Sequence, residues 1–557
     1  MAGGLLNLIA IGNQNIILNG NPTKSFFKNK YAKYTNFGLQ KYRVDTRGNN
    51  KIEISKETPE VTFKIPRYGD LLMDTYLVID LPDIYSPILS ISGEHRPYEF
   101  KWIKNIGTQL IKEVRFFIGS ALVQKFSGSY LQNMVERDFD ANKKELFNIM
   151  TGNVPELNDP ANFADNNNNY PNVYYQTNSD ISGIEPSIRG QQLYIPINIW
   201  FTLMSTMALP LICLQYAELE IRFDLRPLCE LFTIRDVLNK ENYDNNIRIK
   251  ADQTENAHLM YKFTNPPDIS FITRETTYDD TRVEFNPDIH LITTQCFLDN
   301  EERTLFANNT QEYLIKEVYE DIHRKVNKST KVKLKSSNGL VSSWMWHFQR
   351  NDVKERNEWS NYTNWPYENI RPYKLTKLKN DNNEIYYSKP DLYQIQDLSK
   401  NIYITGNSPS DFEQKNFKSI LNRFSIICDG KTREDDLPEG VYSKIEKYTR
   451  TSGNSKEGLY HYNFGINSDP HKYQPSGAFN TNKFKNIEFE FDLTSNPPLD
   501  PVNVNFTTIC DPETGEVIAT SKEPTSIYQY NYDLHIYEER YNILSFQSGL
   551  ADLMYSR

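Results

Sequence analysis

The sequence lacks the short motifs that mark the commonest catalytic sites. Its 557 residues contain no GxSxG nucleophile elbow, no GxxxxGK[ST] phosphate loop, no HExxH zinc motif and no dinucleotide-binding glycine fingerprint. The histidines are scattered, and the nearest pair, His461 and His471, has no further histidine or cysteine spaced to complete a metal site. We therefore expect a protein that is not an enzyme and that has no catalytic residues, no cofactor and no metal site.

Cysteine is scarce as well. The chain has five cysteines, an odd number, and no two of them form a CxxC pair. This pattern argues against a disulfide scaffold and against a zinc ribbon, and it suits a reducing compartment. We expect each cysteine to be a small buried apolar residue: Cys213, Cys229, Cys296, Cys428 and Cys510.

The chain also lacks an excess of basic residues and a long apolar run. Its formal net charge is −10, whereas a protein that grips nucleic acid needs a basic surface, so we expect no direct contact with nucleic acid. Residues 1–20 are rich in apolar side chains, but Asn7, Gly12 and Asn13 interrupt them, and Ala2 excludes the N-myristoylation pattern. We expect an arm that packs against protein, in a chain that is made in the cytoplasm.

The sequence does contain a recurring alternation of apolar and charged residues. In residues 218–225, Leu219, Ile221 and Phe223 alternate with charged side chains, and residues 487–493 repeat the pattern. Because the side chains of a strand point alternately to its two faces, this spacing predicts one buried face and one wet face. Further strands are predicted at residues 61–65, 74–81, 111–119, 342–348, 422–428 and 532–544.

Helical patterns are few and short, at residues 129–139 and 309–318. Strands dominate without regular alternation of strand and helix, which favours all-β sandwiches over a parallel sheet. Each half of the chain closes with an apolar strand, a loop containing proline and an alternating strand, which indicates two similar domains. We expect an N-terminal arm at 1–25, a first domain at 26–226, a linker at 227–257, a second domain at 258–545 and a C-terminal tail at 546–557.

A carbohydrate-binding or carbohydrate-active β-sandwich protein stays open as an alternative. Its sugar platform would be an aromatic cluster, although alternating tryptophans are more typical of a core strand: Trp344, Trp346, Trp359, Tyr362 and Trp365. A carboxylate pair for glycoside hydrolysis is defined in space, so the sequence selects none among its 72 acidic residues.

Four N-x-[ST] sequons are candidates for glycosylation. They arise readily by chance in a chain so rich in asparagine, and synthesis in the cytoplasm keeps them from the usual glycosylation machinery. The four positions are Asn308, Asn327, Asn361 and Asn505.

Several segments carry a family pattern when they are read together. The opening GGLLNLIAIGNQNIILNGNPTKSFFKNKYAKYTNFG pairs an apolar Gly-Gly start with a Gly-Asn-Pro turn at residues 20–22. Others follow in order: IPRYGDLL (65–72), YIPINIWF (194–201), LPLICLQYAELEIRF (209–223), ERTLFANNTQEYLI (302–315), RNEWSNYTNW (356–365), YQPSGAFNTNKF (473–484) and YNILSFQSGLADLMYS (541–556). In this order they resemble the major capsid proteins of nucleocytoplasmic large DNA viruses, in the algal-virus and mimivirus-like group. The resemblance spans essentially the whole chain, although residues 372–416 follow no family pattern.

The resemblance implies a fold of two tandem eight-stranded jelly rolls, a double jelly roll with short helices and long loop insertions. It also implies a homotrimer of pseudo-hexagonal outline that tiles an icosahedral capsid assembled in the host cytoplasm. The implied partners are further copies of the chain, penton and minor capsid proteins and, indirectly, an inner membrane. A small-molecule substrate is not among them.

Overall fold

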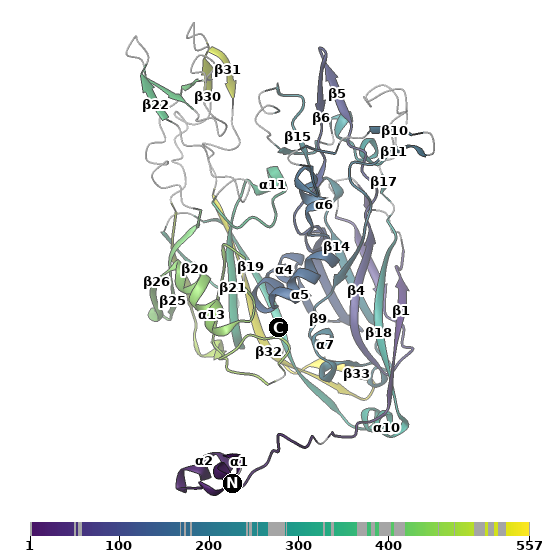
Figure 1. Cartoon of the computed structure of the whole chain (residues 1–557), viewed down its shortest axis with the longest axis vertical. Coiled ribbons are helices and arrows are strands. Elements are labelled where there is room, and N and C mark those ends of the chain that lie inside the picture. The colour runs from purple at the N-terminus through teal and green to yellow at the C-terminus, as the bar shows by residue number, and fades with distance from the viewer. Residues whose placement is uncertain are drawn as a thin grey trace.

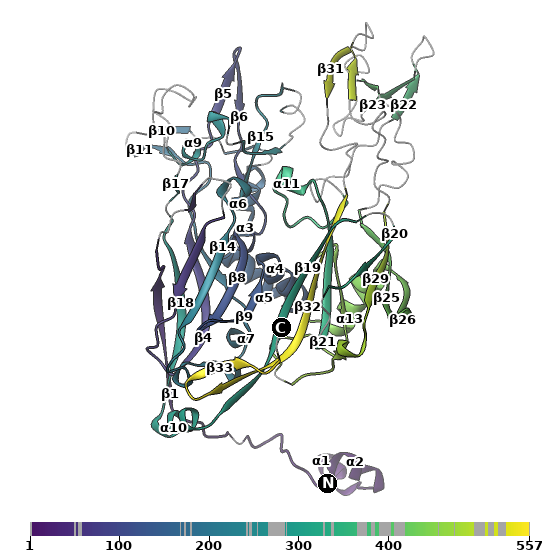
Figure 2. The same ribbon diagram turned by 180° about the vertical axis from the view of Figure 1, so that it is seen from behind.

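The computed structural model describes most of the chain, and Figures 1 and 2 show it from opposite sides. The description omits residues 1–2, 30, 49–51, 54–57, 167–168, 172–173, 179–180, 241–242, 244–247, 253, 266–283, 286, 327–328, 336–338, 365–375, 380–384, 389–402, 406–417, 455, 473, 495–506, 511–516, 522–530 and 556–557.

The first half of the chain forms a sandwich of two antiparallel sheets. Its eight main strands are β1 (Phe37–Asp45), β3 (Glu60–Lys64), β4 (Leu71–Asp80), β8 (Ile111–Ile118), β9 (Ala121–Phe126), β12 (Gln192–Pro196), β14 (Leu219–Leu225) and β18 (Ile289–Leu298). One sheet has the order β1-β18-β4-β12, with the two-residue β13 (Leu209–Pro210) added to β4. The facing sheet has the order β3-β14-β8-β9.

The second half repeats this arrangement strand for strand. Its eight main strands are β19 (Gln311–Val326), β20 (Ser329–Lys333), β21 (Leu340–Arg350), β25 (Leu421–Cys428), β26 (Lys431–Pro438), β27 (Leu459–Asn463), β29 (Ile487–Leu493) and β32 (Tyr532–Gln547). Its sheets have the orders β19-β32-β21-β27 and β20-β29-β25-β26, which match those of the first half position by position. The predicted fold of two tandem eight-stranded jelly rolls is therefore confirmed.

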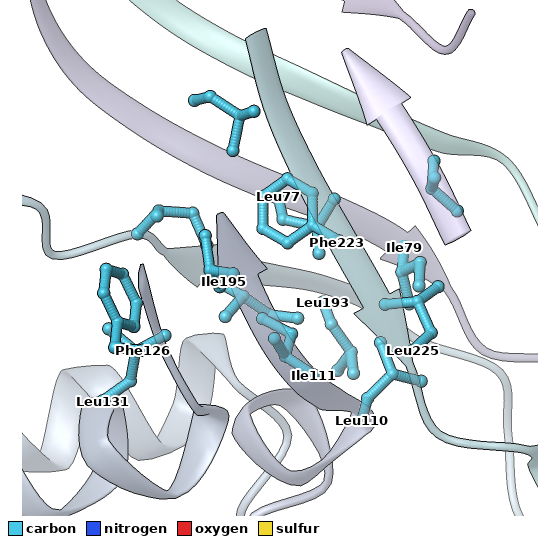
Figure 3. Packing of buried hydrophobic residues seen from close by; sticks show 14 of the residues in the cluster. Leu77, Ile79, Leu110, Ile111, Phe126, Leu131, Leu193, Ile195, Phe223 and Leu225 are labelled. Atoms are coloured by element: carbon cyan, nitrogen blue, oxygen red, sulfur yellow. The ribbon is translucent and has the colours of Figure 1, made fainter. Parts of the chain in front are cut away.

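Alternating apolar side chains build the core of the first jelly roll. In β14 every second residue from Leu219 to Leu225 is buried, and the charged residues between them are partly exposed. Figure 3 shows Phe223 of β14 beside Leu77 of the opposite sheet. Burying a side chain of this size stabilises the fold by about 1.5–3 kcal/mol relative to leaving it exposed.

The sequence repeat marks equivalent strands. β12 and β27 end their sheets, whereas β14 and β29 lie between the first and third strands of the facing sheets. The two motifs that end each half of the chain therefore occupy the same places in the two jelly rolls.

One of the two expected helices is confirmed and the other is wrong. Helix α4 (Gly128–Asp138) begins after the N-cap Ser127, whose side chain accepts a hydrogen bond from Tyr130 N. The helix expected at residues 309–318 is instead the beginning of β19, and the preceding residues form helix α10 (Asn300–Asn308). Tyr313 and Ile315 are buried alternately, as in a strand with one face toward the core. Burial of these side chains in a sheet favours the strand more than the Asn-Thr pair before it favours a helix start.

The strand pairing also departs from the expected division of the chain. β18 belongs to the first jelly roll, although it falls within the segment assigned to the second domain at 258–545. The expected linker at 227–257 contains β15 (Phe232–Arg235), which pairs with β7 (Lys101–Trp102) and with β16 (Arg248–Lys250). The repeat in the sequence ends each half of the chain at the similar strands β14 and β29, but one more of the eight main strands, β18 or β32, follows each of them.

Short hairpins and sheets extend one end of both jelly rolls, at the top of Figures 1 and 2. On the first they include β5 (Ile88–Ile91), β6 (Glu94–Pro97), β10 (Tyr174–Asn178) and β11 (Ile181–Glu185), and on the second β22 (Thr376–Lys379), β23 (Ile385–Ser388), β24 (Tyr403–Thr405), β30 (Thr507–Cys510) and β31 (Val517–Ser521). The short β2 (Ile52–Glu53) pairs with β17 (Glu284–Phe285), and β28 (Phe479–Asn480) pairs with β21.

The remaining short helices are α3 (Ile106–Leu110), α5 (Ala141–Met150), α6 (Pro155–Asn158), α7 (Trp200–Leu203), α9 (Tyr261–Thr264) and α11 (Val353–Arg356). Among the described residues, none of the helices has the length and apolar character needed to cross a membrane.

Candidate assembly surfaces

The two jelly rolls meet at a buried junction in which helix α4 lies against the sheet of β32 and β21 (Figure 1). From this helix, Tyr130 donates a hydrogen bond to Glu539 of β32 over 2.9 Å, and Arg137 pairs with the same carboxylate at 2.7 Å. Ser343 of β21 also donates to Glu539, at 2.7 Å. Arg137 further pairs with its neighbour Asp138 at 2.8 Å. One buried carboxylate therefore ties the first jelly roll to two strands of the second.

The junction depends on how its buried charged side chains are paired. Arg137, Asp138 and Glu539 are all buried. Burial opposes ionisation of the Glu539 carboxyl, but the charges of Arg137 and Lys316, with hydrogen bonds from Arg137 and Ser343, together outweigh burial and lower the pKa of Glu539. A buried ion pair of this kind contributes little net stability, yet removing one partner leaves an uncompensated charge. The junction therefore depends on every member being present.

A second strip of the junction consists of stacked rings. The His347 ring of β21 stacks on Tyr362, with centroids 3.8 Å apart, and on His535 of β32 at 4.8 Å. Asn133 of α4 lies 3.4 Å from His347 Nδ1 and accepts a hydrogen bond from the Tyr362 hydroxyl at 3.0 Å. The third histidine on this face, His461 of β27, is buried next to Met345 in the register of the sheet.

The loop after α11 forms a third link between the rolls. Asn357 donates from Nδ2 to the carbonyl oxygens of Cys229 and Phe232, at 2.8 and 2.9 Å. Trp359 donates to the Glu230 carbonyl at 3.0 Å, and the Arg226 guanidinium lies 4.1 Å from its ring centroid. These contacts and those of α4 fix the two rolls as one body.

At the base of the molecule, the C-terminal part of the chain packs against the first roll. Leu544 and Phe546 of β32 belong to the apolar cluster of the first roll, and β33 (Leu550–Leu553) folds back on β32. Tyr216 N donates to the Gly549 carbonyl at 3.1 Å. The C-terminal segment is hydrogen-bonded to its own chain as far as Tyr555, which exchanges two hydrogen bonds with Asn542.

The N-terminal arm contrasts with this packed body. Its helical turns α1 (Gly3–Ile9), η1 (Asn13–Asn15) and α2 (Ile16–Asn19) contain no buried residue, and they lie away from both rolls in Figures 1 and 2. Most of its large apolar side chains, and the two phenylalanines directly after it, are more than half exposed: Leu6, Leu8, Ile9, Ile11, Ile16, Ile17, Leu18, Phe26 and Phe27. An exposed apolar set of this extent marks a surface that interacts with another molecule.

The alternative sugar platform is not a surface among its described members. Trp344, Trp346 and Tyr362 are at most 1% exposed, and Trp359 is engaged at the junction. Trp365 lies outside the described residues. The carbohydrate reading of this cluster is therefore wrong, because the alternation of Trp344 and Trp346 places both rings in the core of the second roll.

The sequons differ in their environment. Asn308 is exposed at the end of α10, whereas Asn361 is 2% exposed and donates to Glu358 at 3.1 Å. Asn327 and Asn505 lie outside the described residues. The folded chain therefore leaves only Asn308, of the two described positions, open to a modifying enzyme.

The four cysteines whose side chains the structure describes are free thiols, and the side chain of Cys510 is not among them. Cys229, Cys296 and Cys428 are buried as expected, Cys213 is half-buried, and burial raises the pKa of the Cys296 and Cys428 thiols. Among the described residues, no group of three or more His, Cys, Asp or Glu side chains is arranged to hold a metal ion.

Sequence reasoning missed the junction. Its signal is present in α4, where Tyr130, Asn133 and Arg137 recur at helical spacing beside the apolar Leu131, Met134 and Val135. Such a stripe resembles a solvated helix face, and only the fold shows that a sheet covers it.

The fold and these surfaces define a structural protein of the double jelly-roll class. Residues 25–263 match the family described as "Major capsid protein N-terminus", and residues 302–552 match "Large eukaryotic DNA virus major capsid protein". The chain belongs to the major capsid proteins of large eukaryotic DNA viruses. This membership supports the expectation that it is a structural protein and not an enzyme.

Curated relatives agree with this family. "Capsid protein 1" of Acanthamoeba polyphaga mimivirus is 28% identical over 57% of this chain and 44% of its own length. "Major capsid protein" of Chrysochromulina ericina virus is 27% identical over 57% of this chain and 52% of its own length, so these matches span about half of each relative. "Major capsid protein" of Paramecium bursaria Chlorella virus 1 is 23% identical over the full length of both chains.

Solved structures share the fold. A quasi-atomic model of the PBCV-1 virus capsid gives a TM-score of 0.59 at 18% identity, covering 96% of this chain and 100% of that one. The Faustovirus major capsid protein gives a TM-score of 0.60 at 11% identity, covering 94% of this chain and 93% of that one.

Proposed function

We propose that this chain is the main wall protein of an icosahedral virus capsid, in which three copies form a pseudo-hexagonal capsomer. The observation that carries the proposal is the identical strand order of the two rolls. Three chains supply six similar rolls, so a closed trimer presents six similar sides to a hexagonal lattice. The rigid junction supports this use, since a wall unit must keep its two rolls in a fixed relation.

The oligomeric state tests this proposal directly. We expect a stable particle of three times 65.1 kDa by light scattering at micromolar concentration. An obligate interface of this kind buries more than about 2,000 Å². A stable monomer would count decisively against the capsomer.

The N-terminal arm is proposed to tie the base of the capsomer to neighbouring capsomers or to minor and penton proteins. Its exposed apolar side chains support this role, because the described part of its own chain does not cover them. Deleting residues 2–18 should leave the trimer intact and block growth of the lattice. Normal shells from that deletion would refute the arm's role.

The chain is proposed to contact an inner membrane only indirectly, and not to contact nucleic acid. The net charge of −10 supports the second point, since an acidic surface repels the genome. Synthesis and assembly in the host cytoplasm fit the free thiols. Salt-dependent retention of the trimer on DNA at physiological ionic strength would contradict the absence of nucleic-acid binding.

We place the division between the domains within residues 299–310, because β18 completes the first roll and β19 begins the second. The arm at 1–25 and the tail at 546–557 are kept as proposed, although the tail pairs with β32. A separate proposal concerns glycosylation: within the described residues, Asn308 is the position that we propose is modified if the virion chain carries a glycan. An intact-mass shift that survives Asn308→Gln would contradict that assignment.

A further inference from the structure

The junction inside one chain predicts the junction between two chains, because the same elements recur in the second roll. Helix α4 follows β9, which is the end strand of its sheet. In the second roll, a helix made of the π-helical turn η8 (Val441–Ile445) and α13 (Glu446–Arg450) follows β26, the equivalent end strand. We call this segment the second-roll helix.

The second-roll helix differs from α4 in what covers it. Almost all residues of α4 are buried against the neighbouring roll and its own roll. The second-roll helix buries Tyr442 and Lys447, but Ile445 is 56% exposed and Tyr448 is 91% exposed. These two side chains are three residues apart and therefore share one face of the helix, next to the exposed Lys444. An exposed Ile and Tyr at the place where α4 buries its stripe indicate a contact that another molecule completes.

The matching platform is the outward face of the sheet β1-β18-β4-β12. It is equivalent to the sheet β19-β32-β21-β27, whose outward face receives α4. In that receiving sheet Met345 pairs with His461 and Tyr537, and in the first roll Val78 pairs in the same way with Tyr194 and His290. Val78 and His290 are themselves buried, but Tyr194 is 38% exposed on this face, so the platform presents one aromatic ring to solvent.

Position and charge agree with a head-to-tail contact. The strands β25 and β26 lie at one side of the molecule, and β1 and β18 lie at the opposite side (Figures 1 and 2). A surface at one side that fits a different surface at the other side forms a closed ring when the rotation per copy closes. The partly exposed Asp74 and Asp80 on the platform strand β4 complement Lys444 of the helix.

We propose that the second-roll helix docks on the outward face of β1-β18-β4-β12 of a second copy of this chain, with Tyr448 and Ile445 packing over Tyr194. This proposal rests on the trimer proposed above and assigns its contact. It makes the interface between chains a repeat of the junction within each chain.

Cross-linking between different copies tests the contact in the intact trimer. We expect Tyr448→Cys and Tyr194→Cys chains, produced together, to form linked pairs with a short bis-maleimide, and neither variant alone to do so. The native thiols are mostly buried and are present in both single-variant controls. Linked pairs from Tyr448→Cys alone would overturn the head-to-tail geometry.

Disruption of the helix face supplies the second measurement. The double variant Ile445→Asp/Tyr448→Ala should weaken trimer formation at least tenfold by light scattering, with a far-ultraviolet circular dichroism spectrum like that of the wild type. Leu305→Asp, on α10 at the base and also more than half exposed, is the matched control and should leave the trimer unchanged. If the wild type is trimeric but neither the cross-link nor the weakened trimer is observed, the proposed contact is wrong and the proposed trimer is kept. A monomeric wild type would refute both the contact and the trimer.

Discussion

Both faces of one sheet, β19-β32-β21-β27, are buried, but one packs mainly apolar rings, whereas the other carries buried histidines and a charged network among apolar residues. The inward face packs Trp344, Trp346 and Ile536 into the apolar core of the second roll. The outward face presents His347, His535 and Glu539 to the first roll. Apolar packing tolerates small adjustments, whereas a buried polar network must be complete. The inward face therefore supplies stability, and the outward face fixes how the rolls are oriented.

The largest expected effect is on the apolar face. Trp346→Ala should lower the free energy of unfolding by about 3–5 kcal/mol, because it leaves a large cavity among rings such as Phe424, whose centroid is 4.4 Å away. Chemical denaturation of the intact chain measures this loss. Trp346→Phe, which keeps an apolar ring, should recover more than half of it, and equal losses for both variants would contradict a packing role.

On the polar face, Arg137→Ala should cost about 3–4 kcal/mol, because Asp138 and Glu539 remain buried without their partner. The matched control is Arg43→Ala, which removes a half-exposed partner of Asp288 and should cost less than about 1 kcal/mol. Adding Glu539→Gln to Arg137→Ala should restore part of the loss. A double variant as unstable as the sum of the single ones would show that the charges are not coupled.

Acidification should weaken the polar face. Burial lowers the pKa of His535 to about 4, with further lowering by Arg226 and Arg324. Burial also lowers the pKa of His347, with a further contribution from the nearby charge of Lys456. Burial lowers the pKa of His461 in the same way, and the charges of Arg137 and Lys447 add to it. Because these folded pKa values lie below the unfolded value, the unfolded chain binds more protons at mildly acidic pH. The contribution of these neutral histidines to the free energy of unfolding is therefore fully present above about pH 6.5 and is lost as the pH falls toward 4.

His535 alone should account for about 2 kcal/mol of this loss between pH 7 and pH 5. Thermal unfolding at a series of pH values measures it. His347→Gln/His535→Gln should flatten this dependence, and the arm-deleted chain is a control that should keep it. Unchanged slopes in the histidine variant would place the titrating groups elsewhere.

The sequence predicts the inward face far better than the outward one. Alternation in residues such as Leu219 to Leu225 defines strands and core without reference to any distant segment. On the outward face, His535 and Tyr537 flank the apolar Ile536, and Glu539 lies between two charged residues, a pattern that is also typical of a solvated face. They become buried only because α4, some 400 residues earlier in the chain, folds against them. Local pattern reports which side chains share a face, and only the tertiary arrangement reports what covers that face.

The smallest expected effect on stability is at Asn357, in the loop that links the two rolls beside the polar face. This residue has a positive φ of 54° and donates two hydrogen bonds to carbonyls of the first roll. Asn357→Gly keeps the left-handed backbone accessible and loses only the hydrogen bonds, so it should cost about 1–2 kcal/mol. Asn357→Ala should cost about 1 kcal/mol more, because alanine adopts that backbone conformation poorly. Denaturation of both variants separates the two contributions, and an alanine variant as stable as the glycine one would mean that the backbone contributes nothing there.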